Sequence, residues 1–132
     1  MSTTRCPCLS GQTYDECCGR LHRGESTALT AELLMRSRFS AFAVGDADYL
    51  RRTWHPTTRP RDLTLDADLR WYRLDILAAS LGGILDTEGT VEFRAYYRGP
   101  FGPGSQHEVS RFVRTGGEWV YLDGVGQPAD RA

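Results

Sequence analysis

Lysine and long apolar runs are both missing from this 132-residue sequence. All 16 basic residues are arginine, and because 17 residues are acidic the formal net charge is only −1. A charge this close to zero gives no electrostatic reason to expect nucleic acid or a membrane as a partner. No apolar run approaches the ~20 residues of a membrane-spanning helix, and the N-terminal MSTTRCPC lacks the apolar segment of a signal peptide. We therefore expect a cytoplasmic protein.

Cysteine is absent from the chain except in one short stretch, RCPCLSGQTYDECCGR at residues 5–20. This stretch contains Cys6, Cys8, Cys17 and Cys18. Cytoplasmic thiols are kept reduced, and cysteines this close together cannot join distant parts of a chain, so a disulfide scaffold is not favoured. The C-x-C-x8-C-C spacing instead lets four thiolates converge on one ion, since Pro7 fixes a tight turn and Gly11 can adopt a positive φ. Four thiolates complete the tetrahedral coordination of a structural zinc site, which leaves no open position for catalysis.

Two alternatives to coordination by four thiolates follow from the same residues. Adjacent ligands such as Cys17 and Cys18 are crowded, so His22 is a possible replacement for Cys18 as the fourth ligand. A disulfide between Cys17 and Cys18 would instead make the stretch a thiol redox sensor. In either metal arrangement, the ion would supply folding free energy to a segment that is too short to form a hydrophobic core.

The rest of the sequence predicts helices first and strands afterwards. Apolar residues recur at helical spacing between Thr30, which can cap a helix N-terminus, and Gly45, which can end a helix. Asp46 can cap a second helix that ends before Pro56. From Trp71 the period changes to two, which predicts strands over residues 71–80, 90–98, 106–114 and 119–124. This order indicates an α+β fold, with helices packed on one face of an antiparallel sheet of about four strands.

The cysteine stretch and three further blocks resemble a known family. CPCLSGQTYDECCG resembles the SEC-C motif, C-P-C-G-S-G-x-x-Y-x-x-C-C-G, and departs from it at Leu9, where the motif has glycine. LMRSRFSAF, ADYLRRTWHP and SRFVRTGGEWVYLDG are similar to blocks of the YchJ family. That resemblance implies a nuclear transport factor 2-like domain, in which helices close a cone formed by a curved sheet. We therefore expect a SEC-C type zinc knuckle at residues 1–24, a nuclear transport factor 2-like domain at 25–125 and a flexible tail at 126–132.

The resemblance also implies a class of function. SEC-C modules bind zinc, with iron as an alternative, and the SEC-C tail of the protein-export motor contacts an acidic export chaperone and the ribosome. By analogy, we expect an interaction module with a cytosolic protein partner of one of these kinds. Positive charge beside the cysteines, from Arg5, Arg20 and Arg23, suits an acidic partner. No catalytic residues come with the family, so a binding protein is favoured over an enzyme.

A second candidate site follows from the implied cone, because a curved sheet closed by helices can enclose a ligand pocket. The candidate lining residues are Trp54, His55, Tyr97, His107 and Arg111. In an enzymatic interpretation, His55 or His107 would act as general base and Arg111 would hold an anion. In a structural interpretation, His55 bonds carbonyls at a helix end. Arg111 would then pair with a carboxylate of the sheet, at Asp75, Glu92 or Glu108.

Overall fold

The computed structural model describes residues 4–125, and its elements follow the order expected from the sequence. Three helices come first, α1 (Cys18–His22), α2 (Ala31–Val44) and α3 (Ala47–Arg52). Four strands follow, β1 (Arg70–Leu81), β2 (Glu88–Gly99), β3 (Gly102–Thr115) and β4 (Glu118–Val125). The strands form one antiparallel sheet in the order β1-β2-β3-β4, so the predicted α+β fold is confirmed. None of the helices in this part of the chain is long and apolar enough to cross a membrane.

The limits of α2 and α3 are set by short-range interactions that the sequence predicts. Thr30 Oγ1 accepts a hydrogen bond from the backbone N–H of Leu33 at 3.1 Å, which caps α2. Gly45 ends α2 in the left-handed region with φ 81°, where glycine is favoured. Asp46 Oδ1 then accepts from the N–H of Tyr49 at 3.0 Å and starts α3 at once. Helices α2 and α3 are therefore joined by a tight turn at Gly45 and Asp46.

The helix that follows Asp46, α3, is shorter than the sequence predicts, because the residues after it pair with the sheet. Trp54 forms an isolated parallel bridge with Tyr121 of β4. The N–H of His55 donates to the Tyr121 carbonyl at 2.7 Å, and the N–H of Tyr121 donates to the Thr53 carbonyl at 2.8 Å. These bonds take the place of a further helical turn and fix Trp54 beside β4.

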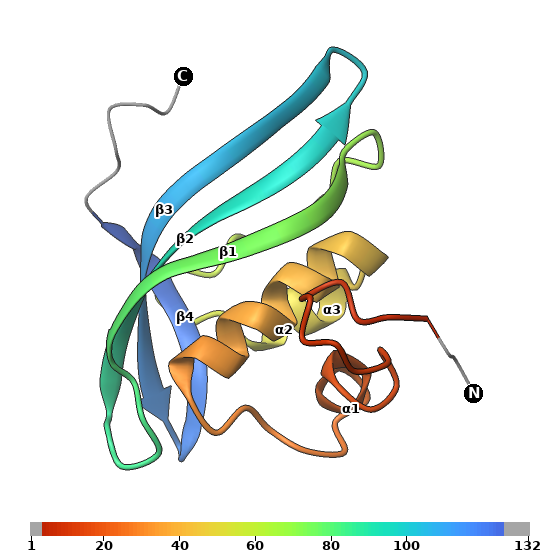
Figure 1. The fold of residues 1–132 in the computed structure, drawn as a ribbon. Coiled ribbons are helices and arrows are strands. Elements are labelled where there is room, and N and C mark those ends of the chain that lie inside the picture. The colour runs from red at the N-terminus through yellow and green to blue at the C-terminus, as the bar shows by residue number, and fades with distance from the viewer. Residues whose placement is uncertain (1–3, 126–132) are drawn as a thin grey trace.

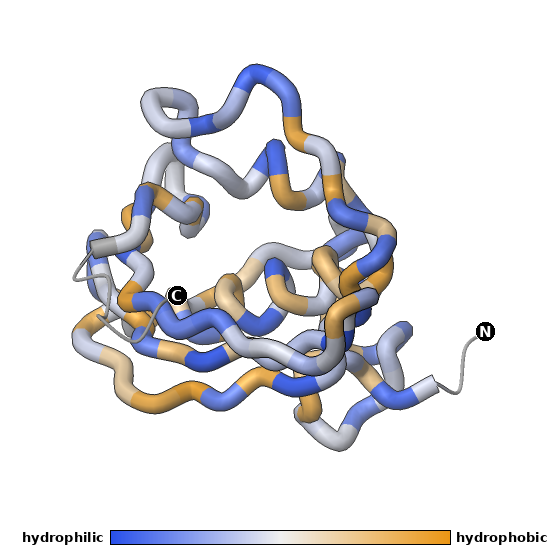
Figure 2. The backbone as a smooth tube through the Cα atoms, turned by 90° about the horizontal axis from the view of Figure 1, so that it is seen from above, coloured by the Kyte–Doolittle hydropathy of each residue, from blue (hydrophilic) through white to orange (hydrophobic). Residues whose placement is uncertain are grey.

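The sheet is strongly curved, and α2 lies against its concave face (Figure 1). Viewed from above, the sheet bends around the helices while hydrophobic and hydrophilic segments alternate along the strands (Figure 2). The core between α2 and the sheet consists of Ala31, Leu34, Met35, Phe39, Leu74, Val91, Phe93, Ala95, Phe112 and Trp119. The knuckle, residues 4–24 of the described chain, packs on the side of α2 that faces away from the sheet (Figure 1). The boundaries of the predicted domains stay predictions, and the predicted tail at 126–132 lies outside the described residues.

A β-bulge in β1 reverses the expected faces at the start of that strand. Strict alternation places Tyr72 with Leu74 on the core face, but the pairing skips Tyr72, since Trp71 pairs with Tyr97 and Arg73 with Tyr96. Tyr72 is consequently exposed, and Trp71 packs against the core instead. The bulge thus brings a tryptophan to the concave face.

Candidate metal centre and cavity

A short loop holds the first two cysteines of the knuckle. Arg5 and Thr13 form an antiparallel bridge, and the N–H of Cys6 donates to the Gln12 carbonyl at 2.9 Å. Gly11, at the far end of the loop, has φ 90°, a conformation that residues with a Cβ rarely adopt. The chain therefore folds back on itself directly after Cys8, as the sequence predicts.

Leu9 occupies the position at which the chain departs from the SEC-C motif. Its N–H donates to the Cys6 carbonyl at 3.1 Å and closes a tight turn around Pro7. This turn gives Leu9 a φ of 66°, in the left-handed region that costs a residue with a Cβ roughly 1–2 kcal/mol. The glycine of the motif is explained by this geometry, and leucine adopts the same turn at a cost in stability.

The second pair of cysteines is positioned by the turn that precedes α1. The N–H of Cys17 is shared between the carbonyls of Thr13 and Tyr14, at 3.0 and 3.1 Å. The N–H of Gly19 donates to the Tyr14 carbonyl at 2.7 Å, and a Cβ on Gly19 would lie only 2.6 Å from that oxygen. Only glycine fits at this close approach, which holds Cys17 and Cys18 over the loop that carries the first pair.

All four sulfur atoms lie within 4.8 Å of one another. The Sγ atoms of Cys8 and Cys17 are 3.6 Å apart, and those of Cys17 and Cys18 are 3.9 Å apart. In a tetrahedral site with Zn–S bonds of about 2.3 Å, sulfur atoms are separated by about 3.8 Å. The four cysteines thus fit the coordination shell of one metal ion, and they are the one candidate ligand cluster among residues 4–125.

The sulfurs are buried and differ in how readily they lose a proton. Cys6, Cys8 and Cys18 are buried, whereas Cys17 is half-buried and accepts a hydrogen bond from Ser10 Oγ at 3.2 Å. Hydrogen bonds from the thiols of Cys18 and Cys8 hold the pKa of Cys6 far below its usual value. The hydrogen bond to Cys6 raises the pKa of Cys18. The neighbouring thiols therefore stabilise a thiolate within the cluster, and the thiolate is the form that binds metal ions.

His22 does not offer a lone pair to a metal ion. Its Nε2–H donates to the Ser37 carbonyl of α2 at 2.8 Å, and its Nδ1 accepts from the Tyr14 hydroxyl at 2.5 Å. Burial lowers the pKa of His22, which keeps the ring neutral in this arrangement. Because both ring nitrogens are engaged, the geometry favours Cys18 over His22 as the fourth ligand. His22 instead fastens the knuckle to α2.

Three further contacts attach the knuckle to the helices. Arg36 Nη1 donates to the Cys8 carbonyl at 3.0 Å, and the Sγ of Cys6 lies 3.5 Å from the Oγ of Ser40. Arg52 of α3 donates from Nη2 to the His22 carbonyl at 2.7 Å. The cysteine cluster is thereby held against the polar side of α2.

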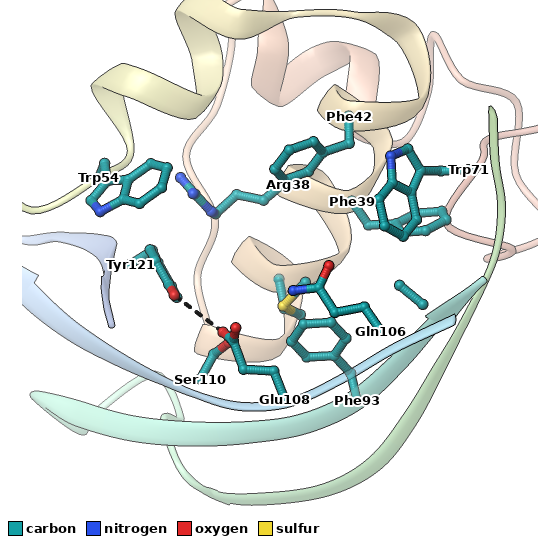
Figure 3. Close-up of a pocket in the computed structure, with 12 residues that line it drawn as sticks. Arg38, Phe39, Phe42, Trp54, Trp71, Phe93, Gln106, Glu108, Ser110 and Tyr121 are labelled. Atoms are coloured by element: carbon teal, nitrogen blue, oxygen red, sulfur yellow. Dashed lines mark hydrogen bonds between the residues drawn. The ribbon is translucent and has the colours of Figure 1, made fainter. Parts of the chain in front are cut away.

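A cavity of about 260 Å³ lies between α2 and the concave face of the sheet. Its walls include Met35, Arg38, Phe39, Phe42, Trp54, Trp71, Phe93, Ala95, Gln106, Glu108, Ser110 and Tyr121. Figure 3 shows Arg38, Trp54 and Tyr121 at one end and the rings of Phe39, Phe42 and Trp71 at the other. Glu108 and Ser110 project from β3 toward the polar end (Figure 3). The cavity therefore has a polar end and an aromatic end.

Comparison with known proteins agrees with both regions of the structure. The family model described as YchJ, middle NTF2-like domain, matches residues 30–124, and the SEC-C motif matches residues 3–20. The chain belongs to the YchJ family. A UPF0225 protein of Streptomyces coelicolor is 56% identical over 94% of this chain and 97% of its own length. Another, from Deinococcus radiodurans, is 49% identical over 89% of this chain and 86% of its own.

Two solved structures share the fold of this YchJ-family chain. The solution structure of a SEC-C motif containing protein from Rhodopseudomonas palustris has a TM-score of 0.78 and 36% identity, covering 90% of this chain and 95% of that one. The crystal structure of a SEC-C motif containing protein from Psychrobacter arcticus has a TM-score of 0.74 and 29% identity, covering 89% and 80%. The expected family and fold are thus confirmed.

Of the five residues predicted to line a pocket, only Trp54 is among the cavity walls. The Nδ1 of His55 accepts from Thr57, so this side chain serves the local turn. Tyr97 packs against Trp71, with ring centroids 5.0 Å apart, and supports the cavity from outside its lining. The structure does not bring these three residues together as one site.

His107 and Arg111 lie on the convex face of the sheet rather than in the cavity. His107 Nε2 is 2.7 Å from the carboxylate of Glu92. Arg111 pairs with Asp123, through two bonds of 2.7 Å, and not with any of the three carboxylates expected from the sequence. The alternation of β3 was predicted correctly, but its other face, with Glu108 and Ser110, points inward. The proposed roles of general base and anion clamp in the pocket are therefore corrected.

Eleven of the twelve cavity residues were not predicted from the sequence, and they include the polar side chains Arg38, Gln106 and Glu108. From the sequence, Arg38 resembles the other arginines of a helix and would be expected on its exposed face. In the structure it is buried between α2 and the sheet. Gln106 and Glu108 lie on the same face of β3 as Phe112, a large apolar residue. Because such a residue favours the core, its position could have predicted that Gln106 and Glu108 point inward.

Proposed function

We propose that this protein is a binding module whose four cysteines hold one structural zinc ion. The mutual approach of the four sulfurs to within 4.8 Å carries the proposal. Cys6, Cys8, Cys17 and Cys18 would act as ligands, and in the reducing cytoplasm they would be available as thiolates. Zinc would supply folding free energy to the knuckle and, with all four positions taken by protein, no activated water. Iron is the alternative occupant, because it accepts the same four thiolates.

Elemental analysis of the protein purified under reducing conditions tests this proposal. We expect about one zinc per chain, and loss of the metal in both Cys17→Ser and Cys18→Ser. A result of one iron per chain would identify iron, the alternative occupant, as the metal of this site. Loss in Cys17→Ser but not in Cys18→Ser would remove Cys18 from the ligand set. Metal-free protein that forms a Cys17–Cys18 disulfide on addition of a mild oxidant would refute the proposal in favour of a redox sensor.

The knuckle also borders a groove that suits a protein partner. The groove, of about 560 Å³, is lined by three of the four cysteines, Cys8, Cys17 and Cys18, and by residues that include Glu16, Arg20, Leu29, Leu33 and Arg36. Leu29 and Leu33 are 58% and 44% exposed, so the groove offers apolar anchors beside the positive charge of Arg20, whereas Arg36 is paired with Glu32. A partner segment with apolar and acidic residues would complement it. An acidic export chaperone, one kind of partner contacted by SEC-C tails, meets this description, and a ribosomal component, the other kind, is the alternative partner.

Co-sedimentation with purified ribosomes and titration with a purified acidic export chaperone test the partner. We expect one of them to bind, more weakly at high salt, because the contacts are partly ionic. A Leu29→Glu/Leu33→Glu variant should lose that binding, whereas Phe101→Glu, at a fully exposed position in the turn between β2 and β3, should retain it. Equal binding by both variants, or no binding by the parent protein, would refute the interaction proposal while leaving the metal site untouched.

A further inference from the structure

Arg38 places a positive charge inside the cavity between α2 and the sheet. Its side chain is only 4% exposed, and its guanidinium carbon lies 4.9 Å from the ring centroid of Trp54 and 4.8 Å from that of Tyr121. Nη1 donates to the Leu50 carbonyl at 2.8 Å and to Thr53 Oγ1 at 2.7 Å. Burial lowers the pKa of Arg38 to about 10, so the group remains charged at neutral pH.

Within residues 4–125, the Nη2 and Nε atoms of Arg38 donate no hydrogen bond to a protein acceptor. Among residues 4–125, Arg38 forms no ion pair with a carboxylate, and only Nη1 makes hydrogen bonds to protein groups. Arginine carries five N–H donors, so those of Nη2 and Nε remain for a molecule within the cavity. The rings of Trp54 and Tyr121 cover the guanidinium, so an acceptor group in the cavity would meet the N–H groups of Nη2 and Nε.

Glu108 provides the opposite charge in the same cavity. Its Oε2 accepts from Ser110 Oγ at 2.5 Å and from the Tyr121 hydroxyl at 3.1 Å. The carboxylate also rests against β4, since a Cβ on Gly124 would lie 2.7 Å from its carbon. These contacts fix the carboxylate, and because an ionised carboxylate accepts about four hydrogen bonds, it can also accept one from a ligand.

The two charges together restrict the ligand. An anion would be attracted by Arg38 but repelled by Glu108, and a cation would be attracted by Glu108 but repelled by Arg38. A neutral group with both an acceptor and a donor can bond both residues without repulsion from either. The aromatic end of the cavity takes a flat apolar body, and 260 Å³ is slightly below the ~300–1,000 Å³ typical of small-molecule pockets, so the body is about one ring.

We propose that the cavity binds a neutral, single-ring compound whose amide-like polar group is held between Arg38 and Glu108. The ring packs against Phe39, Phe42 and Trp71, and the acceptor and donor of the polar group meet the guanidinium and the carboxylate. This site is separate from the metal centre and the groove, so it stands or fails independently of the proposed function.

Nuclear magnetic resonance of the intact, metal-loaded protein tests the site with four probes of similar size: benzamide, benzoate, benzylamine and benzene. The indole N–H signals of Trp54 and Trp71 report on the cavity. Trp119, whose indole donates to the Leu29 carbonyl at 3.1 Å, lies outside the cavity lining and is an internal control. We expect benzamide to shift the first two signals and leave the third unchanged, with the highest affinity of the four probes.

Two variants and one matched control sharpen the test. Glu108→Gln should weaken benzamide binding about tenfold, because a charged acceptor is lost. Gln106→Phe should abolish the shifts by filling the cavity from an exposed position of its wall. Glu92→Gln, the same change on the convex face, should leave binding unchanged. The proposal is overturned by any of three results: no shift at the solubility limit of benzamide, equal affinity in Glu108→Gln, or tighter binding of one of the other three probes.

Discussion

The knuckle buries different side chains from the rest of the fold. We call that second region, which consists of α2, α3 and the four strands, the cone. In the knuckle the buried cluster is Cys6, Cys8 and Cys18, with Tyr14 and Cys17 partly buried against it. In the cone, ten residues of α2 and the four strands form a continuous apolar core. A segment the size of the knuckle buries too little apolar surface to fold alone, so its sulfur cluster replaces a core. The comparison teaches that the two regions should respond to different perturbations.

Loss of one of the four proposed metal ligands should produce the largest effect. In Cys8→Ser the knuckle should unfold, because structural zinc contributes about 10–16 kcal/mol to the folding of small metal-binding modules. The cone should stay folded, since no cysteine belongs to its core. Hydrogen exchange followed by mass spectrometry should show fast exchange at residues 4–24 and protection retained in β2 and β3. Simultaneous loss of protection in the strands would contradict the separation of the two regions.

Truncation in the core of the cone is the converse experiment. Phe112 is fully buried, so Phe112→Ala should lower the free energy of unfolding by about 3–5 kcal/mol. The metal content of the folded protein should equal that of the parent protein. Urea unfolding and elemental analysis on the same sample measure both quantities. A loss of metal without unfolding would show that the sulfur cluster depends on core packing more strongly than its few contacts with α2 indicate.

Removal of the His22 ring should have an intermediate effect. In His22→Ala the Ser37 carbonyl loses its donor and Tyr14 its acceptor, which should cost about 1–3 kcal/mol of stability. Metal content should not change, because His22 is not expected to be a ligand. Thermal unfolding and elemental analysis separate these outcomes. Metal loss in this variant would restore His22 to the ligand set.

The smallest effect should be a gain in stability. Leu9→Gly removes the strain of a positive φ, roughly 1–2 kcal/mol, but adds conformational freedom to the unfolded chain. The net gain should be about 0.5–1 kcal/mol, seen as slower metal loss to a chelator. Leu29→Gly, at an exposed leucine without a positive φ, should give no gain. A faster metal loss in Leu9→Gly would mean that the leucine side chain stabilises the loop.

Features set by short-range interactions could be predicted from the sequence. Thr30 and Asp46 cap helices through bonds to residues three positions later, and Gly45 ends a helix through its own backbone freedom. The cysteine spacing likewise predicted that the four sulfurs converge, because the turn around Pro7 depends only on residues next to it in the sequence. Such features need no knowledge of the rest of the fold.

Features that depend on distant partners could not be predicted. Alternation along β3 groups Glu108 with Ser110, but it does not say which face meets α2, and so His107 and Arg111 were assigned to the wrong side. The skipped residue at Tyr72 depends on the register with β2. Burial of Arg38 depends on two rings, one from the segment after α3 and one from β4. Each is decided by tertiary contacts rather than by spacing.

Helix α2 is shared, with apolar residues against the sheet and buried serines, Ser37 and Ser40, toward the knuckle. A ligand that binds only the folded form stabilises that form according to its concentration and affinity. Because the knuckle is bonded to α2 through His22 and Arg36, part of the binding energy of a metal ion held by the four cysteines would be transmitted to the helix on which the cone is built. The melting temperature of the cone should therefore rise with free zinc, which would make the cone a reporter of metal supply.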